Sequence, residues 1–376
     1  ALIGNVALSH EPPARVFQHP DQAQPLENRL EWAFAEARRQ NLPDEFWVGY
    51  SIRRMMDERS WIGSFDSRQK ANEVTIQELV TGMRSALPRI TDEERLKAAA
   101  RDALKEIEGK PREKVKHSEK KVLKEVAILL RYGDAKIAAL KKASLSNLSL
   151  SFDFKGLPLF WLGESSDEQS LGLIRRLYAQ SAGEKAKDDL LAAAGIHGTS
   201  GLVVPFLEGV LGSGEPESLR KQAAFWIGQQ DDLKGLQILL RAARSDRSER
   251  VRKQAVFSIS QVDLPEAVDG LIELAKDRSL DSSSVRREAV FWLGQTASKK
   301  ATAALEEFVW ENDDAKVQEQ AVFALSGLPD GAGLETLIKI AKTHANQRIR
   351  KKAIFWLGES DDPRALEALI AILKGK

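Results

Sequence analysis

Hydrophobic and polar positions repeat along much of the chain with a period of 32 to 34 residues. The segment RKQAAFWIGQ at 220–229 returns with small changes at 252–261, 286–295, 318–327 and 350–359. The shared aromatic position is Phe225, Phe257, Phe291, Phe323 or Phe355, with steps of 32, 34, 32 and 32 residues. Similar steps backwards reach Ala192 and then Phe160. A period of this length indicates a solenoid, here of about seven units within residues 155–376.

Each repeat contains two patterns that are typical of amphipathic helices. In the first pattern, Val251, Ala255 and Ile259 are spaced four residues apart. The second pattern follows the glycine near the end of the repeated segment. Apolar residues lie 8, 11, 12 and 15 positions after this glycine, as Leu366, Leu369, Ile370 and Leu373 follow Gly358. Both spacings place apolar side chains on one face of an α-helix. Each unit is therefore predicted to be a helical hairpin with a first and a second helix.

Residues that begin and end helices occur at matching places in the repeats. Asp362 before Pro363 predicts a helix start, because aspartate caps a helix and proline loses no hydrogen bond at the first position. Leu264 and Pro265 predict another start of this kind. The predicted N-caps of first helices are Ser248, Ser282, Asp314 and Asn346. First helices are expected to end at a left-handed glycine, namely Gly163, Gly195, Gly228, Gly294 or Gly358.

Residues 1–154 follow a different pattern and are predicted to form an α+β capping module with a charged linker. A helix is expected over 25–40, and strands over 44–54, 60–65 and 147–154, because apolar residues alternate there. The segment 125–145 fits either one long amphipathic helix or a hairpin that turns at Gly133–Asp134. Residues 95–125 are strongly charged, which favours a solvated helix or linker over a binding tail. Since the open end of a solenoid exposes apolar surface, this module is expected to cover the first repeat.

Two rows of side chains recur with the repeat, and each has a structural and a functional interpretation. The arginine ladder could bind phosphates, or each arginine could cap or bridge the acidic turn of an adjacent repeat, which we favour. It comprises Arg220, Arg252, Arg286 and Arg350. The tryptophans could stack on bases or sugars, but packing inside the repeat is favoured because Ser258 and Ala324 replace them in two units. They are Trp161, Trp226, Trp292 and Trp356.

Composition narrows the classes of function. The net charge is +1, and residues 151–376 hold 30 Lys and Arg against 33 Asp and Glu, which disfavours nucleic acid as a partner. The chain contains no cysteine, so disulfides, thiolate metal sites and cysteine nucleophiles are excluded. No apolar run is long enough for a membrane span. The first residue is Ala1, which fits either a trimmed sequence or a mature chain whose export signal has been removed.

The repeats resemble HEAT-like repeats, specifically the short bacterial type of the phycobilisome lyases. The pattern is carried by VRKQAVFSIS, VRREAVFWLGQ and IRKKAIFWLGESDDPRALEALIAIL. This resemblance implies a mainly α fold, a right-handed α-solenoid whose concave face is built mainly from second helices. FWVGYSIRR and the junction Gly156–Gly163 are also similar to exported bacterial HEAT-repeat proteins of unassigned function. That likeness implies a periplasmic or secreted location, with the cytoplasm as the alternative, although many such proteins carry cysteines after this strand.

The resemblance also brings enzymes into consideration. HEAT-like deoxyhypusine hydroxylases bind iron through repeated His–Glu pairs, whereas this chain has one pair, His10–Glu11, outside the repeats. No tetrapyrrole pocket of the bilin lyase kind is recognisable. The five histidines are scattered, so no catalytic residue, metal site or cofactor is assigned.

We therefore predict a non-catalytic scaffold that binds another protein or peptide along the concave face of the solenoid. The alternative is a HEAT-fold enzyme or nucleic-acid binder of the alkylpurine DNA glycosylase kind. The oligomeric state stays open. On the predicted second helices, some charged residues lie away from the apolar stripe and are therefore candidate partner-binding residues. They are Arg175, Lys234, Glu273 and Arg364.

Overall fold

The chain forms two compact units, residues 1–203 and 204–376, in a computed structural model. The structure describes residues 11–42, 45–58, 62, 74–82, 121–133, 139–280, 283–296, 298–312 and 314–374. Most of the predicted strand 60–65 and of the charged segment 95–125, as well as Ser282 and His10, lie outside these residues. No helix in the described ranges has the length and apolar character that a membrane crossing requires.

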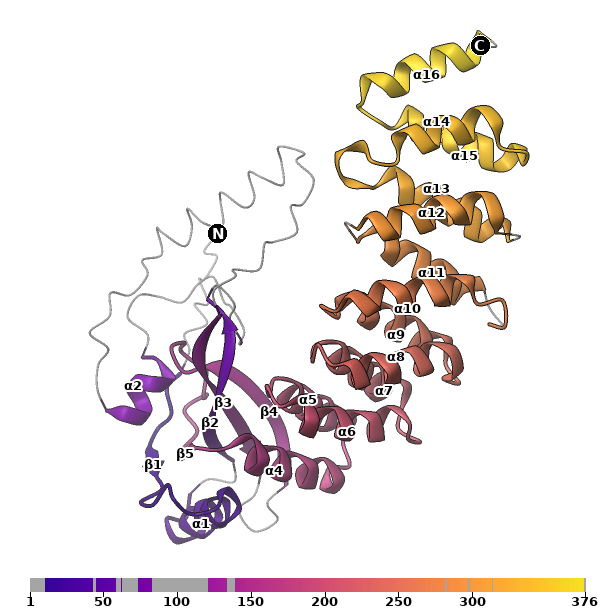
Figure 1. The fold of residues 1–376 in the computed structure, drawn as a ribbon. Coiled ribbons are helices and arrows are strands. Elements are labelled where there is room, and N and C mark those ends of the chain that lie inside the picture. The colour runs from indigo at the N-terminus through magenta and orange to yellow at the C-terminus, as the bar shows by residue number, and fades with distance from the viewer. Residues whose placement is uncertain are drawn as a thin grey trace, which may run out of the picture. The chain divides into compact units, whose positions relative to one another are not determined.

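The N-terminal unit is built on a five-stranded mixed sheet with the strand order β1-β5-β2-β3-β4 (Figure 1). Strand β5 pairs in parallel with β1 and β2, while β2, β3 and β4 are antiparallel neighbours. The strands are β1 (Val16–Gln18), β2 (Phe46–Asp57), β3 (Lys121–Tyr132), β4 (Leu140–Asn147) and β5 (Leu159–Glu164). The helices described in this part are α1 (Leu26–Arg39), α2 (Ile76–Thr81), α4 (Asp167–Gln180) and α5 (Glu184–Gly195).

Both faces of this sheet are covered, which explains why its strands read as apolar runs. On one face, Trp47, Leu129 and Trp161 form a core with Ile76 of α2. On the other face, Trp32 of α1 packs edge-on against Phe160, and Phe34 of α1 packs against Phe46 and Tyr132. Gly49 is required on β2, because a Cβ there would lie 3.0 Å from the Trp161 ring.

The sequence left two interpretations for 125–145, and the structure forms the hairpin, with β3 paired to β4 in antiparallel register. The predicted strand over 147–154 is wrong beyond Asn147, where β4 ends. Leu148 and Leu150 are buried in a turn that follows β4, in which the Leu150 amide donates to the carbonyl of Asn147, so their alternation reflects burial without a strand. Their carbonyls accept hydrogen bonds from Gln77 and Ile76 at the start of α2, in place of a sheet ladder.

The prediction that Phe160 anchors the first helical repeat is also wrong, because LFWLGE forms strand β5 in the interior of the sheet. These letters match FWLGQ of the repeats, but Pro158 and Gly156 precede them where a repeat has a helix. Gly163 has a positive φ of 83° at the end of the strand rather than at a helix terminus. The sheet therefore extends past residue 154, where the sequence placed the end of the N-terminal module.

The C-terminal unit consists of helical hairpins stacked in sequence order (Figure 1). The helix α6 (Ser200–Leu211) precedes five complete pairs in the described chain. The first helices are α7 (Glu217–Gly228), α9 (Glu249–Gln261), α11 (Ser283–Gly294), α13 (Ala315–Ser326) and α15 (Gln347–Gly358). The second helices are α8 (Leu233–Ser245), α10 (Pro265–Lys276), α12 (Lys299–Glu311), α14 (Leu334–Thr343) and α16 (Pro363–Leu373), with a 3-10 turn over Pro329–Gly331.

Most predicted helix ends are confirmed, with one correction. The side chains of Asp314, Asn346 and Asp362 accept capping hydrogen bonds, and α10 begins at Pro265. Ser248 stands at the N-cap of α9 but makes no capping bond. The glycines that end α5, α7, α11 and α15 are not among the positive-φ residues, so the left-handed conformation expected for them is wrong.

The glycines at 228 and 294 are needed instead for close approach between first helices. A Cβ at Gly228 would lie 2.6 Å from the carbonyl oxygen of Ser258, and one at Gly294 would lie 2.7 Å from the Cβ of Ala324. Ser258 and Ala324 are the two positions at which the repeated tryptophan is missing. The repeats therefore alternate between a close contact of small residues and a contact that holds a tryptophan.

Candidate functional site

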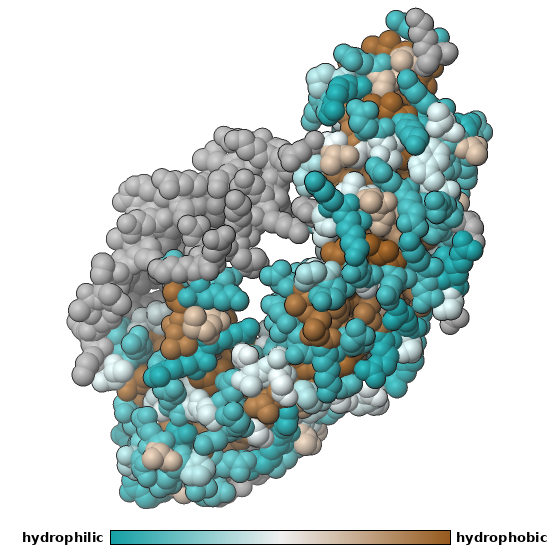
Figure 2. Space-filling model, in the orientation of Figure 1, coloured by the Kyte–Doolittle hydropathy of each residue, from teal (hydrophilic) through white to brown (hydrophobic). Residues whose placement is uncertain are grey.

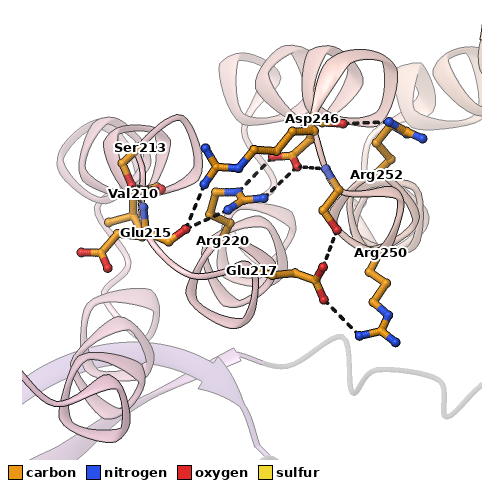
Figure 3. Close-up of polar contacts among 10 residues, drawn as sticks. Val210, Ser213, Glu215, Glu217, Arg220, Asp246, Arg250 and Arg252 are labelled. Atoms are coloured by element: carbon orange, nitrogen blue, oxygen red, sulfur yellow. Dashed lines mark hydrogen bonds and ion pairs between the residues drawn. The ribbon is translucent and has the colours of Figure 1, made fainter.

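The arginine ladder lies inside the repeats, and Arg220 shows its role most clearly (Figure 3). This side chain is only 3% exposed and forms a two-pronged ion pair with Asp246, with nitrogen–oxygen distances of 3.1 and 3.2 Å. It also donates a hydrogen bond of 2.7 Å to the carbonyl of Glu215. Because a buried guanidinium is stable only when its charge and donors are matched, Arg220 joins α7 to the turn that precedes α9.

Each of the other members of the ladder makes one of the two kinds of contact that Arg220 makes, either with a carboxylate of the next repeat or with a carbonyl before its own helix. Arg252 donates to the carbonyl of Asp246, and Arg286 donates to a carboxylate oxygen of Asp314 at 2.8 Å. Arg350 donates to the carbonyls of His344 and Ala345. The contact with the acidic turn of a neighbouring repeat is therefore confirmed for Arg220 and Arg286, whereas Arg252 and Arg350 bond to the segment before their own helices.

The four candidate partner-binding residues lie on different helices, and three of them contact other residues of the chain. Arg175 on α4 donates to the carbonyl of Leu202. Glu273 on α10 pairs with Arg244 at 3.0 Å, and Arg364 on α16 pairs with Asp362 at 2.7 Å. Lys234 on α8 is exposed. Their role in partner binding stays a prediction.

Charged residues of the second helices pair with one another across neighbouring repeats. Arg241 pairs with Glu208, Lys276 with Glu307 at 2.6 Å, and Lys300 with Asp269. These pairs link α6 to α8 and α10 to α12, so much of the charge on this side is neutralised within the stack. Surface pairs of this kind contribute little to stability individually, but they reduce the charge that a partner would meet.

A continuous row of aromatic rings runs along the first helices. We define the aromatic row as Phe225, Phe257, Phe291, Phe323 and Phe355 together with Trp226, Trp292 and Trp356. Phe225 stacks on Phe257 with centroids 6.4 Å apart and an interplanar angle of 6°, and Phe291 stacks on Phe323 with values of 6.3 Å and 6°. The predicted equivalence of the phenylalanines is thus confirmed for these two pairs.

Tryptophans bridge the remaining steps of the aromatic row. Trp292 lies 4.9 Å from Phe257 of the preceding repeat and 5.0 Å from Phe291 of its own repeat. Trp356 connects Phe323 to Phe355 in the same way, with distances of 5.1 and 5.0 Å. The row is therefore one connected set of rings from α7 to α15, and the half-buried packing predicted for these two tryptophans is confirmed.

The phenylalanines of the aromatic row are only partly covered. Phe323 is 36% exposed and Phe355 is 55% exposed, and the other three are of intermediate exposure. Apolar patches between polar residues are visible on the repeats in the face shown in Figure 2. The partial exposure of these phenylalanines was not predicted from the sequence. The signal was present, because Phe257 follows Ala255 by two residues and so lies about 200° around the helix from the buried stripe.

Basic residues border the aromatic row one helical turn before four of the five phenylalanines. We define the basic border as Lys221, Lys253, Arg287 and Lys351, and Glu319 occupies the equivalent position on α13. Residues four apart lie on the same helix face, so the border follows the row from repeat to repeat. Glu319 is paired with Arg348 of α15. The surface along the first helices therefore combines aromatic rings with positive charge.

A buried polar network in the N-terminal unit contains a serine next to a histidine. The Ser170 hydroxyl lies 2.8 Å from His197 Nε2 and 2.9 Å from the Tyr50 hydroxyl, and burial lowers the pKa of His197. All three residues are fully buried, so a substrate has no access to this pair. The network instead connects β2 to α4 and to the segment after α5. Among the described residues, no group of three or more metal-ligating side chains is found.

Comparison with known proteins agrees with this repeat architecture. A model of HEAT repeats matches residues 203–283, and a model of the PBS lyase HEAT-like repeat matches residues 285–309 and 349–375. No curated protein matches the chain.

Several solved structures match about half of this chain at low identity. The complex of CpcE and CpcF of phycocyanin lyase from Nostoc sp. PCC7120 is 19% identical, with 54% of this chain and 80% of that chain covered and a TM-score of 0.31. Human deoxyhypusine hydroxylase in complex with glycerol is 17% identical, with coverages of 55% and 90% and a TM-score of 0.26. Kap121p bound to Pho4p is 13% identical, with coverages of 50% and 25% and a TM-score of 0.33.

At such identities and TM-scores these similarities do not bear on function. The two repeat models and the stacked hairpins agree on the same part of the chain. The chain is therefore an α-solenoid repeat protein that contains HEAT repeats, including repeats of the PBS lyase type.

Proposed function

We propose that the chain is a non-catalytic scaffold that binds another protein through its HEAT-repeat solenoid. The observation that carries this proposal is the partly exposed aromatic row on the first helices. Contiguous apolar surface of this kind is unfavourable in water and is typical of interaction sites. Aromatic side chains also supply a large share of binding energy at protein interfaces.

The aromatic row is suited to binding because its rings are already ordered. Phe291 is held between Trp292 and Phe323, so its side chain has little rotamer freedom to lose when a partner arrives. A flexible exposed residue would lose more entropy on binding. The row therefore offers a rigid apolar surface in the free protein.

The concave face predicted from the second helices remains the alternative surface for the same function. Lys234, Glu273 and Arg364 are all exposed, but Glu273 and Arg364 are engaged in ion pairs. The second candidate function, an enzyme or nucleic-acid binder of the glycosylase kind, is ranked lower because acidic residues outnumber basic ones over 151–376. A periplasmic or secreted location stays a prediction that cell fractionation of the native organism can test.

The two surfaces can be separated with matched variants of the full chain. Phe355→Ala removes an exposed ring of the aromatic row, and Lys234→Glu reverses a charge on the second helices. Proteins captured from the native organism by the wild-type chain are identified by mass spectrometry, purified and titrated calorimetrically against each variant. We expect Phe355→Ala to weaken binding and Lys234→Glu to leave it unchanged. The opposite result would assign binding to the second helices, and unchanged binding to both variants would refute both surfaces.

A further inference from the structure

We infer that the aromatic row and the basic border together bind an extended acidic segment that carries aromatic or long apolar side chains. This inference rests on the proposed function and names the chemistry of the partner. It follows from the charge of the first helices, from how that charge is paired, and from the spacing of the rings.

The first helices carry a strong excess of positive charge. The five helices α7, α9, α11, α13 and α15 contain 12 Lys and Arg against 4 Asp and Glu, although the whole chain has a net charge of only +1. Four of the twelve form the arginine ladder, whose guanidinium groups donate hydrogen bonds to other residues of the repeats. The others include the basic border. A surface with this charge attracts acidic partners and repels basic ones.

The four acidic residues of the first helices neutralise only part of this charge, because twelve basic against four acidic residues leave a net charge of +8. Glu217 pairs with Arg250, and Glu249 pairs with Lys253. Glu288 accepts a hydrogen bond of 2.9 Å from the Trp292 indole. The fourth, Glu319, is paired with Arg348.

Positive charge is most accessible beside the most exposed ring. Lys351 and Lys352 on α15 are both exposed and lie one helical turn before Phe355. Within the described chain, neither lysine has a hydrogen bond or an ion pair with another residue. An acidic side chain that approaches Phe355 would therefore meet two ammonium groups without displacing an existing contact.

The spacing of the rings fits an extended segment. Side chains on one face of a β-strand are about 6.6–6.8 Å apart, which is twice the rise per residue. The stacked pairs Phe225–Phe257 and Phe291–Phe323 have centroids 6.4 and 6.3 Å apart. Gln222, Gln254 and Gln320 repeat three residues before three of these phenylalanines, and a carboxamide can donate to and accept from a peptide backbone.

The same aromatic and basic character could suggest single-stranded nucleic acid, but the ring geometry argues against it. Bases bind aromatic side chains by stacking on an open ring face. In each phenylalanine pair the facing surfaces are already stacked on one another, at a distance that leaves no space for a base. Glu288 also places a carboxylate beside Trp292, where a phosphate would be repelled.

A displayed library of random peptides tests the inference while the natural partner is still unidentified. Peptides of about 15 residues extend far enough to cross several first helices. They are selected on the immobilised full chain at about 50 mM salt, where surface charge is weakly screened. We expect enriched peptides to combine Asp or Glu with Phe, Trp or Leu. Enrichment of basic peptides, or of apolar peptides without acidic residues, would overturn the inference.

Labelled copies of the enriched peptide are then titrated by fluorescence anisotropy against three folded variants. The double variant Lys351→Glu with Lys352→Glu should bind about tenfold more weakly, and Phe355→Ala should also weaken binding. The matched control Lys234→Glu should stay within about twofold of the wild type. A peptide with lysine in place of its acidic residues should prefer the double variant. Equal binding of both peptides by the double variant would overturn the charge argument.

The outcomes separate this inference from the proposed function. If the native partner needs Phe355 but the enriched peptides are not acidic, the scaffold function stands and the inference fails. If neither depends on Phe355, the inference fails, and the scaffold function also fails unless the native partner depends on Lys234. If oligothymidylate binds more tightly than every peptide and needs Phe355, nucleic acid replaces the acidic segment as the partner.

Discussion

Gly228→Ala tests the close contact between α7 and α9, which recurs between α11 and α13. The added Cβ would lie 2.6 Å from the carbonyl oxygen of Ser258 and 2.9 Å from the Ser258 Cβ. Favourable contacts between heavy atoms begin near 3.5 Å between carbons, so α7 and α9 would have to move apart by roughly 0.5–1 Å. Such overpacking costs about 1–3 kcal/mol.

The substitution also has a favourable part, which must be subtracted. Alanine is more stable than glycine inside a helix by about 0.5–1 kcal/mol. The expected net loss of unfolding free energy is therefore about 1–2 kcal/mol. For a unit of roughly 170 residues this corresponds to a melting temperature lower by about 2–8 °C.

Gly358→Ala is the matched control, because Gly358 occupies the same repeat position at the end of α15. A Cβ there would have no heavy atom within 4 Å. Only the helix preference remains, so this variant should be as stable as the wild type or more stable. Both variants are compared by urea unfolding and thermal melting followed by circular dichroism. If Gly228→Ala were as stable as Gly358→Ala, the helices would not approach as closely as described and the alternation of contacts would be refuted.

Three further predictions concern packing, buried charge and pH. Trp292→Ala removes a half-buried ring between two repeats and should lower stability by about 2 kcal/mol in urea unfolding, and an unchanged midpoint would contradict its packing role. Asp246→Ala leaves Arg220 buried without its carboxylate and should cost about 3 kcal/mol by the same assay, whereas a loss near zero would show that the pair is not structural. Burial lowers the pKa of His197, so the unfolded state binds the proton more readily and stability should fall as pH drops below about 6.5. Melting curves from about pH 7.5 to about pH 5.5 should show this fall in the wild type and a smaller one in His197→Gln, and equal slopes would refute it.

The repeat architecture was predictable because it depends on local sequence features that recur with the repeat period. Apolar spacing, caps such as Asp314 and the proline at 265 act within one or two helical turns, so each helix could be located from its own segment of the chain. The structural role of Arg220 was also predictable, since Arg220 and Arg286 recur in step with the acidic turns of Asp246 and Asp314. The outward position of Phe257 also has a local signal, which is its angle of about 200° around the helix from Ala255.

Other features depend on contacts between distant residues and left no local signal. LFWLGE at 159–164 has the letters of a repeat but becomes a strand, because β1 and β2 supply hydrogen-bonding partners on both sides. Leu148 and Leu150 alternate like a strand, yet their carbonyls bond to the start of α2. The glycine at 228 is explained by Ser258 in the next repeat rather than by its own backbone conformation.

The amino-acid sequence by itself determined the period, the helical pairs and the residues that occupy equivalent positions, because helix formation and capping depend on neighbours within a few residues. Only the tertiary structure decided which apolar residues stay exposed, which charges are already paired and which glycines make room for another helix. These properties depend on atoms brought together from separate repeats, and the composition of one repeat does not contain them. The aromatic row became a candidate binding surface only once the side chains that cover it, and those that do not, were in place.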